Sequence, residues 1–372
     1  MRSRDEEGVS AYEKKLVSVI CILTLAVSGL CGCGSKQEST ADTQTGQSKE
    51  INVMIWDSTY PDEVFDQFEE ETGIHVNVSY ITNTDELITK MVSGENEFDY
   101  VDVESAYVKT FVENGLLAKI DYDKIPNSEN IDDKFWGAVG DEKNEYTMPV
   151  SDNIYSLIVY NKETCPIEIK SFADLADPAL EGQVCMINST ISLYGTALES
   201  LGYSADSTSE DEIAEANDLL GKIKKNVKAF VGTSAMSQLE TGDCSVAFCY
   251  DYPYLMMDKN NWDKYGVAAI DSGYERSNGF VGIPASSEKK EEAEEFMNFI
   301  LQPEIQAEFA QEAGQASLLK RDLMTPVMPD GYYDNPYFNM DPGIEENSWH
   351  IAIDDDQIAI MDKYYTMLMG SE

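Results

Sequence analysis

Strand and helix periodicities alternate along the chain after residue 50. Residues 51–56 form an apolar run rich in β-branched side chains, and residues 74–80 alternate between apolar and polar positions, as in a half-buried strand. Residues 63–68 have helical spacing, and Gly73 is suited to end that helix. The predicted elements are strands at 51–56, 74–80 and 100–103 and helices at 63–68, 85–92 and 105–114. This order predicts an α/β fold with a mainly parallel sheet.

A second α/β set follows Pro149. It opens with an apolar run at residues 154–160, which is suited to a strand that crosses from one lobe to another. Strands are predicted at 184–187, 245–249 and 267–270, a return of the chain at 281–284, and helices at 193–201, 210–225, 288–301, 303–313 and 354–369. No internal repeat is present, which argues against a solenoid or a propeller.

The N-terminal region has a different pattern. Two lysines precede an apolar run at residues 16–30, which is too short to span about 30 Å of hydrocarbon comfortably. The run ends in Leu30-Cys-Gly-Cys33, which resembles the cleavage motif of bacterial lipoproteins, with Cys33 as the acylated residue. This resemblance implies a signal peptide over residues 1–33, a flexible tether over 34–49 and an extracytoplasmic protein anchored by lipid to the outer face of the cell membrane. A single-pass membrane anchor is the alternative.

Composition adds a strong charge imbalance. The chain has 26 basic and 69 acidic residues and a formal net charge of −43, whereas its 42% of apolar and 10% of aromatic residues are ordinary for a globular protein. Such a field repels nucleic acid and anionic lipid headgroups and attracts cations. The alternative interpretation is a solvated acidic surface that keeps an exported protein soluble.

The residue types argue against catalysis and cofactor binding. The sequence contains two histidines, and it has no Gly-x-Ser-x-Gly turn, phosphate-binding glycine loop or His-Glu-x-x-His motif. The cysteines at positions 165, 185, 244 and 249 lack metal-ligand or redox spacing, and we interpret them as small buried residues. We therefore predict that the protein is not an enzyme and uses no metal or cofactor.

Several segments resemble one family of transport proteins. The resemblance rests on residues 68–76, 98–103, 113–121, 171–175, 178–184, 282–285 and 293–303. These segments are similar to the extracytoplasmic solute-binding proteins of ABC importers, specifically the spermidine/putrescine-binding group. The resemblance covers the chain from about residue 51 onward, apart from a divergent stretch near residues 325–345.

The resemblance implies a two-lobed, type II periplasmic-binding-protein-like fold with a hinge between the lobes and a ligand in the cleft. Lobe one would comprise residues 51–150 plus 278–372, and lobe two residues 151–277. The protein, expected to be a monomer, would close around a polyamine or similar organic cation and deliver it to an ABC permease in the membrane.

The family pattern also implies ligand-binding positions in the first lobe. Trp56 coincides with a site tryptophan of the family, whereas the tyrosine expected three residues later is Thr59, with Tyr60 beside it. The Ser-Thr-Tyr stretch of the family falls on Glu104-Ser105-Ala106, followed by Tyr107.

The other implied positions lose carboxylates that a polyamine site needs for its ammonium groups. The acidic pair of the second lobe falls on Ser189 and Ser192, and a site tryptophan becomes Tyr250. Tyrosine and glutamine positions near the C-terminus fall on about Gln315 and His350. Because hydroxyl groups also suit neutral partners, the alternative ligand is another small polar solute, such as an aminoalkyl compound or a sugar.

Glu104, Asp152 and Asp251 are candidates to replace the missing carboxylates. The alternative is that Asp152 and Asp251 face solvent and that Glu104 caps the helix that follows it. Tyr250 is expected to form an aromatic wall of the cleft, and Tyr254 to pack in the core. A lipoprotein enzyme on the same scaffold is a further, less favoured alternative.

Overall fold

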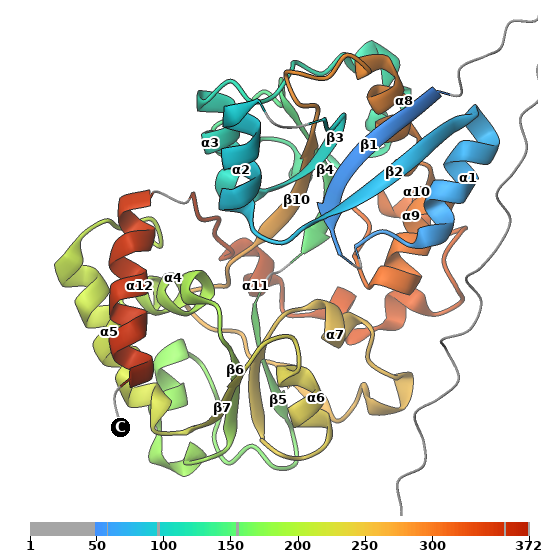
Figure 1. Ribbon diagram of the computed structural model, residues 1–372. Helices are drawn as coiled ribbons and strands as arrows, with labels where there is room; N and C mark the ends of the chain where they lie inside the picture. The colour runs from blue at the N-terminus through green and yellow to red at the C-terminus, as the bar shows by residue number, and fades with distance from the viewer. Residues whose placement is uncertain (1–48, 58, 95–96, 154–155, 353–354, 371–372) are drawn as a thin grey trace, which may run out of the picture. The chain divides into compact units, whose positions relative to one another are not determined.

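The computed structural model describes residues 49–57, 59–94, 97–153, 156–352 and 355–370 (Figure 1). In this part of the chain, the strands form two five-stranded sheets. The predicted signal peptide, Cys33 and the tether up to residue 48 lie outside the described residues. Among the helices that the structure describes, none combines the length and the apolar character that crossing a membrane requires.

The first sheet has the strand order β2-β1-β3-β10-β4. Its strands are β1 (Lys49–Trp56), β2 (Ile74–Ile81), β3 (Tyr100–Glu104), β4 (Thr147–Asn153) and β10 (Ser277–Gly282). Strand β1 runs parallel to β2 and β3, whereas β10 is antiparallel to β3 and β4. Since β10 follows the second sheet in the sequence, the first sheet is complete only after the chain returns to it.

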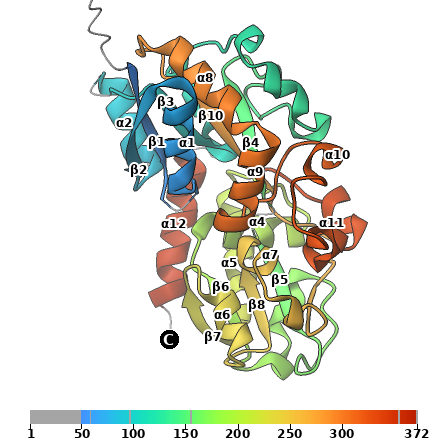
Figure 2. The same cartoon turned by 90° about the vertical axis from the view of Figure 1, so that its right-hand side faces the viewer.

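Helices from distant parts of the sequence pack around the first sheet (Figure 2). They are α1 (Asp62–Thr72), α2 (Thr84–Ser93), α3 (Val108–Glu113), α8 (Lys290–Ile300) and α9 (Pro303–Glu308). Phe68 of α1 and Phe296 of α8 are fully buried, and their rings meet edge to face with centroids 5.0 Å apart. Helix α1 ends at Gly73, as predicted, because the φ of 75° at that residue suits glycine.

The second sheet has the strand order β7-β6-β8-β5-β9. Its strands are β5 (Leu157–Asn161), β6 (Val184–Ile187), β7 (Val227–Val231), β8 (Val246–Cys249) and β9 (Tyr265–Val267). The helices near it include α4 (Thr190–Ser200), α5 (Glu210–Lys224), α6 (Ala235–Glu240) and α12 (Asp355–Gly370). Every residue of β6 and β8 is buried, as expected for central strands that are covered on both faces.

The C-terminal helix α12 packs with α4 and α5 of the second sheet. Met361 and Leu368 of α12 belong to the same hydrophobic core as β6 and β8. This packing differs from the predicted division, in which all of residues 278–372 belong to lobe one. The exact boundary between the lobes remains a prediction, but the apolar face of α12 is buried with the second sheet.

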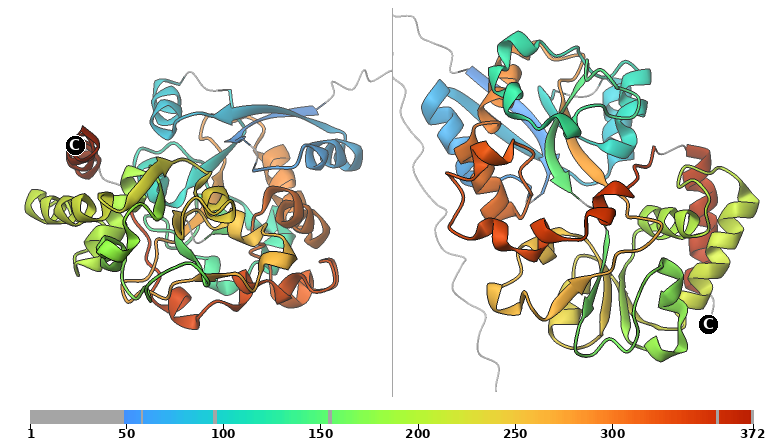
Figure 3. Two further views of the ribbon diagram at one scale, coloured as in Figure 1. Left: turned by 90° about the horizontal axis from the view of Figure 1, so that it is seen from below. Right: turned by 180° about the vertical axis from the view of Figure 1, so that it is seen from behind.

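The chain passes from β4 to β5 and returns from β9 into β10 (Figure 3). Short helices lie on the later parts of the chain, namely α7 (Tyr252–Leu255), α10 (Arg321–Met324) and α11 (Pro342–Glu346). The α9 helix continues into a π-helical turn, Phe309–Ala313, so the predicted helix at 303–313 is present with a change of type.

The α/β class and most predicted elements are confirmed, and the differences have physical causes. Tyr80, predicted on the buried face of its strand, is 48% exposed because β2 is an edge strand. Strand β9 covers Tyr265–Val267 instead of 267–270, and β4 was not predicted because polar residues fill its second half. The cysteines at 185, 244 and 249 are buried, as predicted, and Cys165 is half-buried.

Gly273 provides a test of the packing between the segment before β10 and the chain after α11. Its φ is 66°, and a Cβ at this position would lie 1.8 Å from the backbone oxygen of Asn347. Gly182 has the same φ of 66° with open space around it. We expect Gly182→Ala to cost roughly 1–2 kcal/mol from the left-handed backbone alone, and Gly273→Ala to cost about 1–3 kcal/mol more. Urea unfolding of both variants measures the difference, and equal free energies of unfolding would contradict this packing.

Candidate functional site

A cavity of about 290 Å³ opens at the carboxyl ends of β1 and β3. Strand β1 has β2 and β3 as its two parallel neighbours, so the cavity lies where the strand order reverses, a common place for ligands in α/β sheets. Residues of β4, β10 and the loop after the π-helical turn complete its wall. The polar and aromatic residues that line it include Trp56, Thr59, Tyr60, Asp102, Glu104, Ser151, Ser277, Asn278 and Gln315.

Asp102 is held by two hydrogen bonds at the end of β3. Its Oδ2 accepts the backbone N–H of Trp56 at 3.0 Å, and its Oδ1 accepts the Tyr60 hydroxyl at 2.9 Å. The Tyr60 hydroxyl also lies 2.6 Å from the hydroxyl of Tyr100, which is fully buried. Because Tyr60 has a single hydroxyl proton and gives it to Asp102, Tyr100 donates to the Tyr60 oxygen. This series of hydrogen bonds, from Tyr100 to Tyr60 to Asp102, fixes the position of the Asp102 carboxylate.

Three carboxylates near the cavity are removed from water. Burial raises the pKa of Asp102 to about 7, against the N–H of Trp56 and the Tyr60 hydroxyl, which lower it. Burial also raises the pKa of Glu104, whose Oε1 accepts the Thr84 hydroxyl at 3.0 Å. Glu275, on the segment between β9 and β10, is 4% exposed, and burial raises its pKa to about 7.

The described part of the chain supplies no cationic partner for these carboxylates. Among the residues that the structure describes, no lysine or arginine forms an ion pair with Asp102, Glu104 or Glu275, and the Oε2 atom of Glu275 has no hydrogen-bond partner. Glu104 and Glu275 each feel the charge of a neighbouring carboxylate, which raises their pKa further. Buried negative charge of this kind is stabilised by a bound cation.

Five of the predicted site residues line this cavity, namely Trp56, Thr59, Tyr60, Glu104 and Gln315. The Gln315 side chain donates from Nε2 to the backbone oxygen of Thr59 at 2.9 Å, which joins two parts of the wall. Glu104 makes no capping bond to the helical turn Ser105–Tyr107 that follows it, so the capping alternative is wrong. The role of these residues in binding remains a prediction.

Two other predicted carboxylates have partners away from this cavity. Asp152 Oδ1 accepts Nε and Nη2 of Arg276, at 3.1 and 2.5 Å, on the opposite face of β4. Asp251 is buried, and its Oδ2 accepts the Tyr337 hydroxyl at 2.9 Å. The alternative that both face solvent is therefore wrong, and neither lines the cavity beside Trp56.

The remaining predicted residues also lie outside its lining. Ser189 is the N-cap of α4 and accepts the backbone N–H of Ser192, which is itself fully buried. Ser105 lies behind the cavity wall, with its hydroxyl 3.1 Å from that of Ser277. His350 lines a separate cavity of about 60 Å³ with Ser105. Tyr107 and Tyr250 are partly buried, and Tyr107 packs against the cores near α3.

Tyr250 and Tyr254, which follow β8, were predicted to have different roles, and the structure bears on the second of them. Tyr254 is 2% exposed and packs in the core of the second sheet, which confirms the prediction for it. The ring of Tyr250 stacks on that of Tyr252, with centroids 6.5 Å apart.

Asp102 and Glu275 are the main residues of this site that sequence reasoning missed. Asp102 and Glu104 are polar residues at alternate positions near the end of an apolar strand, so their spacing places both side chains on one face. That spacing was a usable signal. Gly279 allows β10 to approach β4, since a Cβ there would lie 2.4 Å from the Ser151 hydroxyl oxygen. Nothing in the local sequence indicates this contact.

A family model described as "Bacterial extracellular solute-binding protein" matches residues 63–320. The chain belongs to this family. The spermidine/putrescine-binding periplasmic protein of Salmonella typhimurium is 26% identical over 354 residues, which cover 92% of this chain and 97% of that protein. Its counterpart in Escherichia coli K12 is 25% identical over 312 residues and covers 81% of this chain and 86% of that protein.

Solved structures confirm the predicted two-lobed fold of periplasmic binding proteins. A putative spermidine/putrescine ABC transporter from Listeria monocytogenes superposes with a TM-score of 0.75 at 24% identity, over 87% of this chain and 99% of that one. The predicted resemblance to the spermidine/putrescine-binding group is confirmed by the relatives from Salmonella typhimurium and Escherichia coli, which are binding proteins by name.

The raised pKa of Asp102 predicts how stability depends on pH. An aspartate in the unfolded chain titrates near 3.9, whereas Asp102 titrates at about 7 when folded, so the folded state binds this proton more tightly. The stability that comes from the proton is present below pH ~4 and is lost as the pH rises through ~7. Asp102→Asn cannot ionise, so its stability relative to the wild type should rise between pH 4 and pH 8, by on the order of 4 kcal/mol.

Urea unfolding at pH 4, 6 and 8 measures this effect. Asp133→Asn makes the same substitution at an exposed aspartate and serves as the control, against which the change in Asp102→Asn is read. A difference between Asp102→Asn and the wild type that is constant or falls with pH would show that Asp102 is not a desolvated carboxylate.

Proposed function

We propose that this protein is the extracytoplasmic binding component of an ABC importer and that it binds a polyamine, such as putrescine or spermidine, in the cavity beside Trp56. The observation that carries the proposal is the group of buried carboxylates, Asp102, Glu104 and Glu275, that has no cationic partner among the described residues. The names of the related binding proteins support the same class of ligand.

The cavity offers the two kinds of contact that an alkyl diamine needs. Asp102 and Glu104 lie on one face at the end of β3 and can accept charge-assisted hydrogen bonds from an ammonium group. The indole of Trp56 supplies an aromatic surface for the methylene chain and for a cation–π contact. A cation at this place would favour the ionised carboxylates and so remove the cost of their burial.

We propose that the residues lining the cavity make the direct contacts and that closure of the lobes brings the second lobe to the ligand. In this proposal Ser189, Ser192 and Tyr250 approach from the second lobe, and Ser105, Tyr107 and His350 support the wall. The closed form would then dock on an ABC permease as a monomer. No enzymatic step is proposed.

A second candidate function is uptake of a different small polar solute. The hydroxyls of Ser151 and Ser277 and the amide of Gln315 belong to the same cavity wall. These neutral groups suit an aminoalkyl compound with hydroxyl groups, or a sugar, better than a simple diamine.

Calorimetric titration with putrescine and spermidine tests the proposal. We expect a dissociation constant around 1 μM, or about −8 kcal/mol. Glu104→Gln keeps the size of the side chain and removes its charge, so it should weaken binding about tenfold or more. Glu113→Gln makes the same change on an exposed glutamate of α3 and is the matched control, with affinity as in the wild type.

Absence of heat with either polyamine would remove the polyamine assignment. A thermal-shift screen over amines, amino acids and sugars then decides the alternative, since a ligand at 100 times its dissociation constant adds about 2.7 kcal/mol of stability. A shift with a sugar alone would favour the neutral-solute function. Equal affinities for Glu104→Gln and Glu113→Gln would show that Glu104 does not contact the ligand.

The lipid anchor at Cys33 is also a proposal. When the full chain is expressed in a bacterium fed with radiolabelled palmitate, we expect the label in the protein and the protein in the membrane fraction. Cys33→Ser should lose the label, and Cys31→Ser, which changes a cysteine upstream of the proposed cleavage point, should keep it. Label that persists in Cys33→Ser would overturn the assignment.

A further inference from the structure

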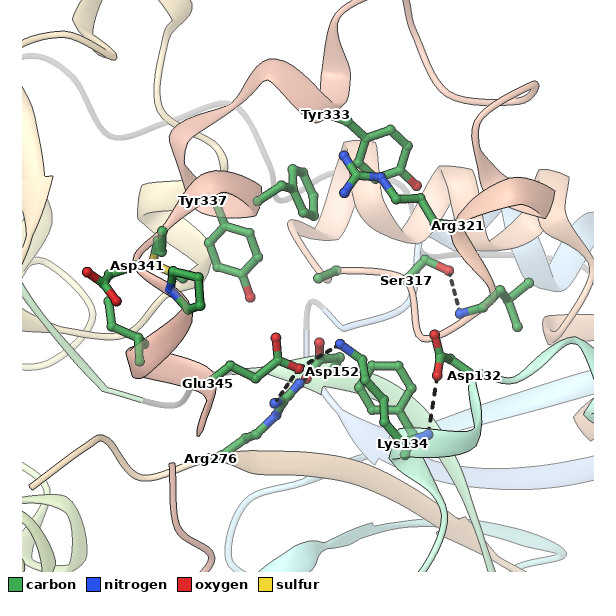
Figure 4. Close-up of a pocket in the computed structure, with 17 residues that line it drawn as sticks. Asp132, Lys134, Asp152, Arg276, Ser317, Arg321, Tyr333, Tyr337, Asp341 and Glu345 are labelled. Atoms are coloured by element: carbon green, nitrogen blue, oxygen red, sulfur yellow. Dashed lines mark hydrogen bonds and ion pairs between the residues drawn. The ribbon is translucent and has the colours of Figure 1, made fainter. Parts of the chain in front are cut away.

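Arginine is scarce in this acidic chain, and its distribution is uneven. The described residues contain two arginines, Arg276 and Arg321, whereas lysines are spread over both sheets. Both arginines line the same cavity, which has a volume of about 240 Å³ (Figure 4). This cavity is separate from the one beside Trp56, because the two share no lining residue.

The two cavities lie on opposite faces of the same chain segments. Ser151, Ser277 and Gln315 line the candidate polyamine cavity, whereas the residues adjacent to them in the sequence, Asp152, Arg276 and Ala316, line the second one. Side chains alternate between faces along an extended segment, which explains this division. A backbone bridge between Asp152 and Ala316 holds two of these segments together.

The charges on one side of the second cavity are already paired. Arg276 donates from Nε and Nη2 to Asp152 and from Nη1 to Glu345, the last at 3.2 Å. Lys134 donates to the same Glu345 oxygen at 2.8 Å. Two cations therefore meet two carboxylates, and the side chain of Arg276 is only 11% exposed. This network leaves little capacity for a ligand.

Arg321, on the opposite side of this cavity, differs from Arg276 in its contacts. Its guanidinium stacks on the ring of Tyr333, 4.3 Å from the centroid, and the close-up shows the two side chains together at the cavity edge. In the described part of the chain no carboxylate forms an ion pair with Arg321, although this protein has 69 acidic residues against 26 basic ones. A stacked guanidinium keeps its edge, with the N–H donors, open to a partner in the plane of the group.

We propose that this second cavity binds a small carboxylate with an apolar or aromatic body and that Arg321 is the partner of the carboxylate. A guanidinium presents two parallel N–H groups at the spacing of the two carboxylate oxygens, which a lysine cannot do. Phe338 and Tyr337 provide apolar wall for the body of the ligand.

The other carboxylates of the second cavity are expected to weaken the binding of an anion there. Asp132 and Asp341 also line it, and each accepts a backbone N–H, from Lys134 and Gly343 respectively. Their charge and the net charge of −43 oppose an anion, so binding relies on the contact with Arg321 rather than on long-range attraction. We expect a dissociation constant on the order of 1 mM for a ligand of about ten non-hydrogen atoms.

Saturation-transfer NMR with benzoate on the purified protein tests this proposal, with benzyl alcohol and benzylamine as probes that keep the ring and change the charge. We expect transfer to benzoate and much less to the other two. Arg321→Gln should weaken benzoate binding about tenfold or more, and Arg321→Lys by less, since it keeps the charge and loses the paired N–H groups. Arg321 is exposed, so both variants should unfold at the wild-type temperature.

Lys320→Gln is the matched control. Lys320 is the residue before Arg321, lies outside this cavity and donates to the backbone oxygen of Glu129, so its loss removes one positive charge without touching the site. Benzoate affinity should be unchanged in this variant. No transfer to benzoate, equal affinities for Arg321→Gln and Lys320→Gln, or stronger transfer to benzylamine would each overturn the proposal. None of these results depends on whether a polyamine binds beside Trp56.

Discussion

The alternation of side chains along β4 and β10 is the constraint on which the rest of this structure depends. These two strands pair antiparallel where the chain leaves the first sheet and where it returns, with Gly279 opposite Ser151. Residues opposite each other share a face, so one face presents the hydroxyl of Ser151 to the candidate polyamine cavity. The other face carries the ion pair of Asp152 with Arg276. A shift of one residue in this register would exchange the two faces, and both cavities would lose their chemistry.

The two faces of β4 and β10 also differ in how their carboxylates are paired. Asp102 and Glu104 project from β3, next to β10, into the cavity beside Trp56. Burial removes their carboxylates from water, and no basic side chain of the described residues balances their charge. On the reverse face every carboxylate of the network meets a cation. Unpaired charge is expensive to bury, so the buried carboxylates beside Trp56 are a better indication of a ligand than the net charge of −43.

The fold class could be predicted from the sequence because the periodicity of apolar residues and the residues that end helices are clear in short segments. The alternation at β2, the helical spacing of α1 and the glycine that ends it are properties of short segments. Strand β4 was missed because its role depends on pairing with β10, more than 120 residues later, rather than on its own apolar content. Asp152 was assigned to the ligand for the same reason, since its partner Arg276 is 124 residues away. Such contacts are created by the fold and leave no local signal.

The family pattern brings five of its implied positions to the lining of one cavity, and their role in binding remains a prediction. Trp56 is the last residue of β1 and Gln315 follows the π-helical turn, so elements of the fold fix where both lie. At Ser192 the pattern implies an acidic residue, and the side chain that lies beside this serine is Glu275, whose pKa the Ser192 hydroxyl lowers against the effect of burial. A carboxyl group is therefore present beside Ser192, and it comes from the segment that enters β10. A binding site for a cation depends on the electrostatic potential where the ligand lies, not on which residue supplies the charge. In this fold the carboxylates can come from either of the two segments that connect the sheets, β4 to β5 or β9 to β10.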